Sequence, residues 1–245
     1  MMSKKRAAIS ADIISSTSLT IYEIATLQKI IRETFKLLEK QLQDKSELFW
    51  GRVVKGDTIE CVFESPRYAL RSALLLKSAI LLVPSTWDAL RDEEQIQKGF
   101  EYFLSYGIRL AIGIGEMRTV DPITGIFDGD AIYKSGRKIA EYSTSGKERI
   151  TIKNTLYYVS DNKEEDQIVN TLLSFVDVLL KKATIKQLQV LFYKLQDMKD
   201  PEIAVKLGLG VSTVNKHSTL MGWNAIAELL DLYENTIHAK NKEIC

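Results

Sequence analysis

The segment from residue 184 to about 222 constrains the fold most, because two short helical patterns in it are separated by a glycine. Asp200-Pro201-Glu202 is a compact helix start, with Asp200 as the N-cap and proline at the first helical position. Gly208 ends this helix, and a second one is expected from Ser212 to Leu220. The apolar positions that face inward are Ile203, Ala204, Leu207 and Val214. Two helices joined by so short a turn predict a helix-turn-helix module.

The second predicted helix carries short polar or charged side chains on its outer side, which suit a DNA major groove. They are Ser212, Thr213, Asn215, Lys216, His217 and Thr219. Asparagine can make two hydrogen bonds to adenine, so Asn215 is the expected base reader. Lysines outnumber acidic residues between positions 181 and 219, which favours contacts with the phosphates of double-stranded DNA. The alternative is a helical bundle used only for packing or dimerisation.

The charge of the whole chain gives no attraction to nucleic acid, because 33 Lys and Arg residues face 32 Asp and Glu residues. Cys61 and Cys245 lack the close Cys or His neighbours of a zinc site or a disulfide framework, so we expect free thiols. No apolar run is long enough for a signal peptide or a membrane span. These features predict a cytoplasmic protein.

The first 160 residues alternate between strand-like and helix-like patterns. Strands are expected at 7–14, 48–54, 58–63 and 108–115, with one or two more within 148–159, and helices at 22–42, 67–83 and 130–142. The stretch 85–98 fits a loop or an exposed helix, and 118–128 fits a hairpin or a cover over a ligand site. The order β-α-β-β-α-β predicts an α+β, ferredoxin-like domain with its helices on one face of the sheet.

A polar run lies just beyond this domain and predicts a linker at residues 161–167. The expected domains are therefore 1–160, with mixed α and β structure, and 168–245, which is all helical. Helices in the second domain are predicted at 168–181, 184–197, 201–207, 211–221 and 223–237.

Two aspartates stand at expected strand ends, where sheet geometry holds an exposed carboxylate. Asp12 closes the first strand, and Asp57 lies in the turn Lys55-Gly56-Asp57. Together with the backbone carbonyl of Ile13, they could hold Mg²⁺ against the phosphates of a nucleotide. The structural alternative is equally open, because caps and turns also select aspartate.

The segments Ala11–Thr17, Gly56-Asp57 and Ile112–Glu116 occur in the order found in class III nucleotide cyclases, and the N-terminal half resembles a diverged cyclase domain. The chain is similar over nearly its whole length to the SatD family, in which such a domain precedes a helix-turn-helix. Gly113-Ile114-Gly115-Glu116, Asp128–Ala131 and the C-terminal pattern from Lys186 to Trp223 carry this resemblance.

The cyclase resemblance implies that Asp12 and Asp57 bind metal and that Arg137 stabilises the phosphoryl transition state. Two positions depart from the cyclase pattern: Tyr133 replaces the ribose-orienting asparagine, and Val53 replaces the base-contacting lysine. Arg52 and Lys55 are nearby cations that could substitute. Losing such contacts costs several kcal/mol of transition-state stabilisation, so efficient cyclisation is not expected. A solvated position on a helix is the structural alternative for Arg137.

These observations favour a bacterial-type transcriptional regulator that needs no cofactor. The cyclase-like domain would dimerise or sense a ligand such as a nucleotide. The resemblance implies a homodimer paired through this domain, which would place two helix-turn-helix units on DNA. A metal-dependent cyclase using Mg²⁺ and a nucleotide is the second hypothesis. An interaction adaptor that uses neither site is the third.

Overall fold

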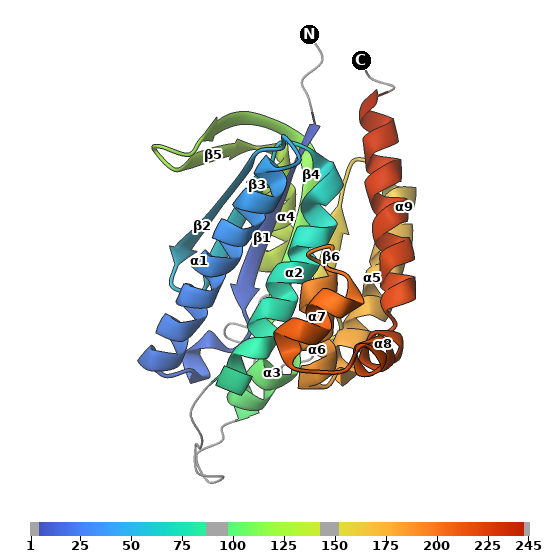
Figure 1. Ribbon diagram of the computed structural model, residues 1–245. Helices are drawn as coiled ribbons and strands as arrows, with labels where there is room; N and C mark the ends of the chain where they lie inside the picture. Colours follow the sequence, from blue (N-terminus) through green and yellow to red (C-terminus); the bar gives the residue numbers. More distant parts are fainter. Residues whose placement is uncertain (1–4, 87–97, 143–151, 243–245) are drawn as a thin grey trace.

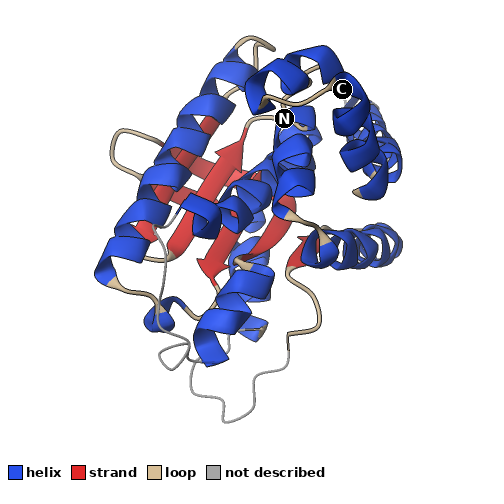
Figure 2. Ribbon diagram, turned by 60° about the horizontal axis from the view of Figure 1, so that its bottom comes forward, coloured by secondary structure: helices blue, strands red, loops and turns tan. Residues whose placement is uncertain are grey.

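The computed structural model describes residues 5–86, 98–142 and 152–242 and shows a mixed α and β protein with a curled sheet at its centre (Figures 1 and 2). The strands are β1 Lys5–Ile13, β2 Phe49–Lys55, β3 Thr58–Phe63, β4 Ile108–Asp121, β5 Ile126–Gly129 and β6 Leu156–Val159. The α-helices are α1 Ile21–Gln43, α2 Ala69–Leu82, α3 Lys98–Tyr106, α4 Asp130–Glu141, α5 Lys163–Lys182, α6 Ile185–Lys194, α7 Asp200–Leu207, α8 Val211–Leu220 and α9 Trp223–Lys242.

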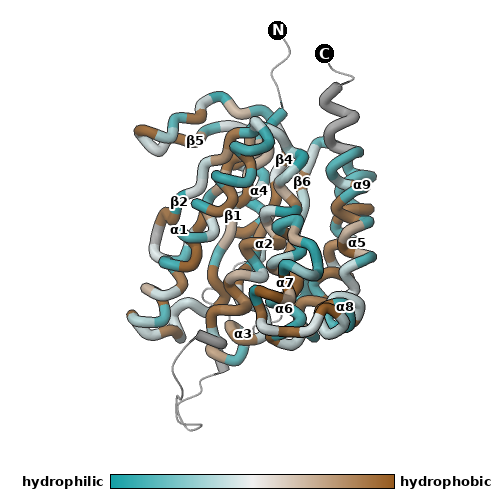
Figure 3. Tube along the Cα trace, viewed as in Figure 1, coloured by the Kyte–Doolittle hydropathy of each residue, from teal (hydrophilic) through white to brown (hydrophobic). Residues whose placement is uncertain are grey.

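The sheet is antiparallel in the order β2-β3-β1-β4-β5, and β6 pairs with β4 in parallel. Because β1 is central, its apolar residues are buried on both faces. Ala7, Ile9, Ala11 and Ile13 join the main core, whereas Ala8 joins a smaller core on the opposite face. The brown segments of β1 and α2 lie accordingly in the interior in Figure 3. The predicted mixed fold class is confirmed.

Helices cover both faces of the sheet, so the expectation of helices on one face only is wrong. Leu27 and Ile31 of α1 and Leu70 of α2 pack in the main core, while Ala131 and Ile132 of α4 pack in the smaller core on the other face. Glycine in β4 allows α4 to come close. A Cβ atom added to Gly113 would lie 2.2 Å from the carbonyl oxygen of Ala131.

The polar run that predicted a linker at 161–167 is mostly the first turn of α5, which begins at Lys163 rather than at residue 168. Asn162 is the N-cap, and its side chain accepts hydrogen bonds from the backbone nitrogens of Glu164 and Glu165. Acidic residues in a first turn also interact favourably with the helix dipole. The polarity of this run therefore reflects a helix start.

Two further differences lie near β4. This strand extends to Asp121, beyond the predicted end at 115, and forms a hairpin with β5, which resolves the alternatives for residues 118–128. Helix α3 covers Lys98–Tyr106. The sequence patterns predicted no element for residues 99–106. β6 confirms a strand before residue 159, while 143–151 and 87–97 lie outside the described residues.

The C-terminal helices pack directly on the sheet-bearing part of the chain. Leu188 and Leu191 of α6 and Leu230 of α9 belong to the same apolar cluster as the strands and α2. Arg71 of α2 adds ion pairs to Asp197, at 2.9 Å, and to Glu234 of α9, at 2.7 Å. The division into domains 1–160 and 168–245 remains a prediction. None of the described helices is both long enough and apolar enough to cross a membrane.

Candidate functional site

Helices α6, α7 and α8 enclose a small apolar core of their own. Val190, Ile203, Ala204 and Val214 are buried in it. Gly208 ends α7 with φ of 63°, a left-handed conformation that glycine adopts without strain, and the chain enters α8 three residues later. The predicted helix pair and the inward position of Val214 are thus present in the structure.

The start of α7 differs in detail from the sequence prediction. Lys199 is the N-cap and its backbone nitrogen donates to Glu202 Oε2 at 2.7 Å. Asp200, predicted as the cap, is the first helical residue, and its Oδ1 lies 2.5 Å from Lys194 Nζ. This ion pair joins the end of α6 to the start of α7.

The outer surface of α8 carries most of the predicted DNA-contacting residues. Ser212, Asn215, Lys216 and Thr219 are exposed on one side, while Val214 and Ser218 are buried on the other. Thr213 and His217 are half-buried, and His217 Nδ1 is buried without a hydrogen bond to any described residue. The structure therefore separates four accessible polar side chains from two that lie partly within the helical packing.

The two aspartates predicted to bind metal come together at one end of β1. Asp12 lies opposite Thr58 of β3 and Arg109 of β4, and the backbone nitrogen of Ile13 donates to the carbonyl oxygen of Asp57 at 3.2 Å. Asp57 Oδ2 accepts a hydrogen bond of 2.6 Å from Ser16 Oγ. The turn between β2 and β3 thus places Asp57 beside the end of β1, as the sequence analysis expected.

A buried arginine that the sequence analysis did not select accompanies Asp12. Arg109 is 1% exposed, its Nη1 lies 3.8 Å from Asp12 Oδ2, and the same nitrogen donates to the carbonyl of Tyr142 after α4. Burial raises the pKa of Asp12, the Arg109 guanidinium opposes this shift, and the charge of Asp57 adds to it. The positive charge of Arg109 therefore only partly offsets the unfavourable burial of the ionised Asp12 carboxylate.

The donor atoms at this strand end fit a divalent cation. Asp12 Oδ1 is buried and accepts no hydrogen bond from any residue that the structure describes. Carboxylate and carbonyl oxygens are the ligands that Mg²⁺ prefers, and a cation would stabilise the ionised form of Asp12, which burial disfavours. Arg109 competes as a positive charge already in place. Across 5–86, 98–142 and 152–242, no cluster of three His, Cys, Asp or Glu side chains could hold a metal ion.

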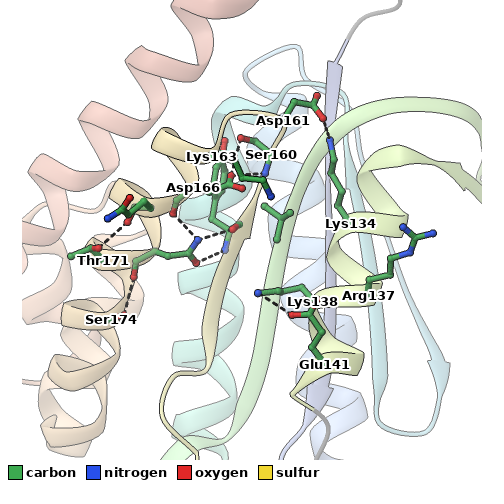
Figure 4. A pocket seen from close by; sticks show the side chains of 14 residues that line it. Lys134, Arg137, Lys138, Glu141, Ser160, Asp161, Lys163, Asp166, Thr171 and Ser174 are labelled. Atoms are coloured by element: carbon green, nitrogen blue, oxygen red, sulfur yellow. Dashed lines mark hydrogen bonds and ion pairs between the residues drawn. The ribbon is translucent and has the colours of Figure 1, made fainter.

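Arg137 lies away from these aspartates. It is exposed on α4, and within the described part of the chain it makes no hydrogen bond or ion pair with Asp12 or Asp57. It borders a groove of about 810 Å³ between α4, β6 and α5. Figure 4 shows its side chain directed away from α5, while Lys134 reaches Asp161 and Lys138 reaches Glu141. One chain alone thus does not assemble the three residues implied by the cyclase resemblance.

The two side chains that depart from the cyclase pattern make contacts within this chain. Tyr133 is exposed and donates a hydrogen bond to Asp128, which raises the pKa of its hydroxyl. Val53 packs against the main core. Arg52, one of the proposed substitute cations, is held by Glu60, with Nε 2.8 Å from Oε2, and its guanidinium lies over the ring of Phe127. Its charge is therefore already engaged.

Comparisons with known proteins give only distant similarities. No known protein family matches this chain, and no curated protein matches it. Two solved structures, both described as a bacterial light-regulated adenylyl cyclase, match 64% of this chain at 14% sequence identity. The matches cover 77% and 43% of those chains, with TM-scores of 0.39 and 0.38. The SatD resemblance consequently remains a prediction.

Proposed function

We propose that this chain binds double-stranded DNA and inserts α8 into the major groove. The observation that carries the proposal is the two-sided character of α8. Val214 and Ser218 anchor one side, while Asn215, Lys216 and Thr219 are exposed on the other. Helices that read DNA need such an anchored element with short polar side chains, because base edges lie deep in the groove.

Each exposed residue of α8 has a role in this proposal. Asn215 supplies a donor and an acceptor for an adenine edge, and Ser212 and Thr219 contact bases or phosphates. Lys216 contributes a positive charge toward the phosphate backbone. The half-buried Thr213 and His217 support the helix at the edge of the contact. The residue types on α8 and their exposed positions are therefore both consistent with contacts to DNA.

The sheet-bearing part of the chain acts as a regulatory domain in this proposal. The strand order β2-β3-β1-β4 supports a ferredoxin-like, cyclase-type sheet, and the proposed membership of the SatD family rests on the sequence resemblance alone. A homodimer would present two copies of α8 to successive major grooves and would bind a two-part site. Transcriptional regulation is the biological role we propose for such an arrangement.

The test is retardation of genomic DNA fragments by the full chain at several salt concentrations. We expect binding that weakens with salt and is lost on combined Asn215→Ala and Lys216→Ala substitution. Lys36→Ala, an exposed lysine on α1, serves as the matched control and should bind as the wild type does. Absence of salt-sensitive binding in the wild type would contradict the proposal.

The orphaned oxygen of Asp12 favours a second candidate function, recognition of a divalent cation together with a nucleotide. Asp12, the Ile13 carbonyl and Asp57 would hold the ion, which would supply positive charge to phosphate groups. The test is the melting temperature with Mg²⁺ or Mn²⁺ and ATP or GTP. We expect a rise that Asp57→Ala abolishes, and an unchanged melting temperature would remove this candidate.

A further inference from the structure

One face of α5 exposes a row of apolar side chains that the proposed function does not use. Ile168 is 59% exposed, Phe175 67% and Val178 50%. Together with exposed Thr171, they follow one another at intervals of three and four residues, the spacing of a seam between two paired helices. We call Ile168, Thr171, Phe175 and Val178 the α5 seam.

The opposite face of α5 fixes the seam in place. Leu173, Val176 and Leu180 are buried in the main core, and Asp177 accepts hydrogen bonds from Thr155 and Leu156 at the start of β6. α5 and α9 lie on the side of the molecule opposite β2 and β5 (Figure 1). The seam is therefore held on a rigid helix at the periphery, where a second molecule can reach it.

We propose that a second copy of this chain covers the α5 seam, with the two α5 helices antiparallel about a twofold axis that crosses the seam at the level of position 173 along the helix. Such an axis brings together positions whose numbers lie equally far from 173. Ile168 then meets Val178 of the other copy, and Thr171 meets Phe175. Because a twofold axis repeats each contact, every apolar side chain of the seam is covered.

The charges at the two ends of the seam support the antiparallel direction. Glu164 lies one interval before Ile168, and Lys182 lies one interval after Val178, and both are exposed. Antiparallel pairing places Glu164 of each copy opposite Lys182 of the other, whereas parallel pairing would oppose like charges. The acidic first turn, with Glu164, Glu165 and Asp166, also disfavours DNA or an anionic membrane as the occupant.

The first test compares molar mass in solution without DNA, by light scattering after size-exclusion chromatography. We expect the wild type to be a dimer and Phe175→Glu to be a monomer with the same circular dichroism spectrum, because its side chain is exposed. Ile21→Glu, at an 89% exposed position on α1, is the matched control and should remain a dimer. The outcome does not depend on whether the chain binds DNA.

Charge reversal distinguishes this pairing from any other. Glu164→Lys and Lys182→Glu should each weaken dimerisation by about tenfold, because two exposed ion pairs are replaced by repulsive contacts. The double variant should restore the wild-type dissociation constant, since the opposite charges face each other again. A monomeric wild type would overturn the proposal, and so would a dimer unaffected by Phe175→Glu, which would indicate pairing through the sheet-bearing part instead.

Discussion

Lys77 Nζ in α2 lies 3.6 Å from Asp177 Oδ1 in α5, and the two side chains are only 2% and 11% exposed. The same ammonium group donates to the carbonyls of Tyr106 and Ile108 and to Thr155 Oγ1, at 3.0, 2.9 and 2.6 Å. Burial lowers the pKa of Lys77, and the carboxylate of Asp177 opposes this shift. One lysine thus links α2 to the end of α3, the start of β4, the residue before β6, and α5 inside the protein.

We expect Lys77→Met to lower the free energy of unfolding by about 3 to 5 kcal/mol, because it leaves Asp177 as a buried charge without its partner. Urea denaturation followed by tryptophan fluorescence measures this loss. Lys36→Met, at an exposed position, should change stability by no more than about 0.5 kcal/mol. Equal effects of the two substitutions would show that the buried pair is not important for stability.

Two glycines at the contact of α4 with the sheet should respond oppositely to alanine. Gly113→Ala places a methyl group 2.2 Å from the Ala131 carbonyl oxygen, so α4 must shift, and we expect a loss of about 1 to 3 kcal/mol. Gly136 lies within α4, and an added methyl group would meet only Ser10 Oγ, at 3.8 Å. Gly136→Ala should therefore stabilise the protein by about 0.5 to 1 kcal/mol. Thermal unfolding of both variants tests this prediction. Melting temperatures that shift in the same direction for the two variants would contradict this packing.

The raised pKa of Asp12 has a defined consequence for stability. Burial favours the protonated form in the folded protein, so above pH 3.8, its ordinary pKa, the unfolded chain ionises first. The contribution of Asp12 to stability therefore falls as pH rises, until the folded-state pKa has been passed. The side chain of the Asp12→Asn variant is uncharged at every pH. As pH rises over this interval, the free energy of unfolding of the variant should therefore increase relative to that of the wild type. Urea titrations at several pH values test this, and a difference that is constant with pH would refute it.

Asn215 and Lys216 should affect DNA binding in different ways. Lys216→Ala removes one phosphate contact, so it should weaken binding to all sequences alike and reduce the slope of log K against log salt by about 1. Asn215→Ala should cost about 1 to 3 kcal/mol and relax preference at one base pair. Fluorescence anisotropy with a selected site and its single-base variants separates the two effects. Identical profiles for both variants would argue against their assigned roles.

Local patterns predicted most of the secondary structure, because the information lies within a few neighbouring residues. The three- and four-residue spacing of Leu27, Ile31, Thr34 and Leu38 predicted α1, and Gly208 predicted the break between α7 and α8. The linker prediction failed at Asn162 because a capped, acidic first turn has the same composition as an exposed loop.

Long-range relationships were harder to predict. The approach of Asp57 to Asp12 followed from a hairpin turn beside β1, but the sequence could not show which residue of β4 lies opposite Asp12. Arg109 was visible as a charge between Ile108 and Leu110 in an apolar strand, and a buried cation needs a partner. That signal could have identified it. The position of α4 on the second face depends on packing across the whole sheet.

The attachment of the C-terminal helices to α2 limits how a signal could reach α8. Leu188 and Leu191 of α6 share the main core, and Arg71 connects to Asp197 beside α7. A DNA-binding domain on a flexible linker would respond to a ligand through a change in the range of positions that it can occupy. α8 packs on α6, and α6 packs on α2, so under the proposed function a displacement of α2 would be transmitted to α8 through α6. An excised C-terminal fragment would expose the apolar surface of α6 that the full chain buries.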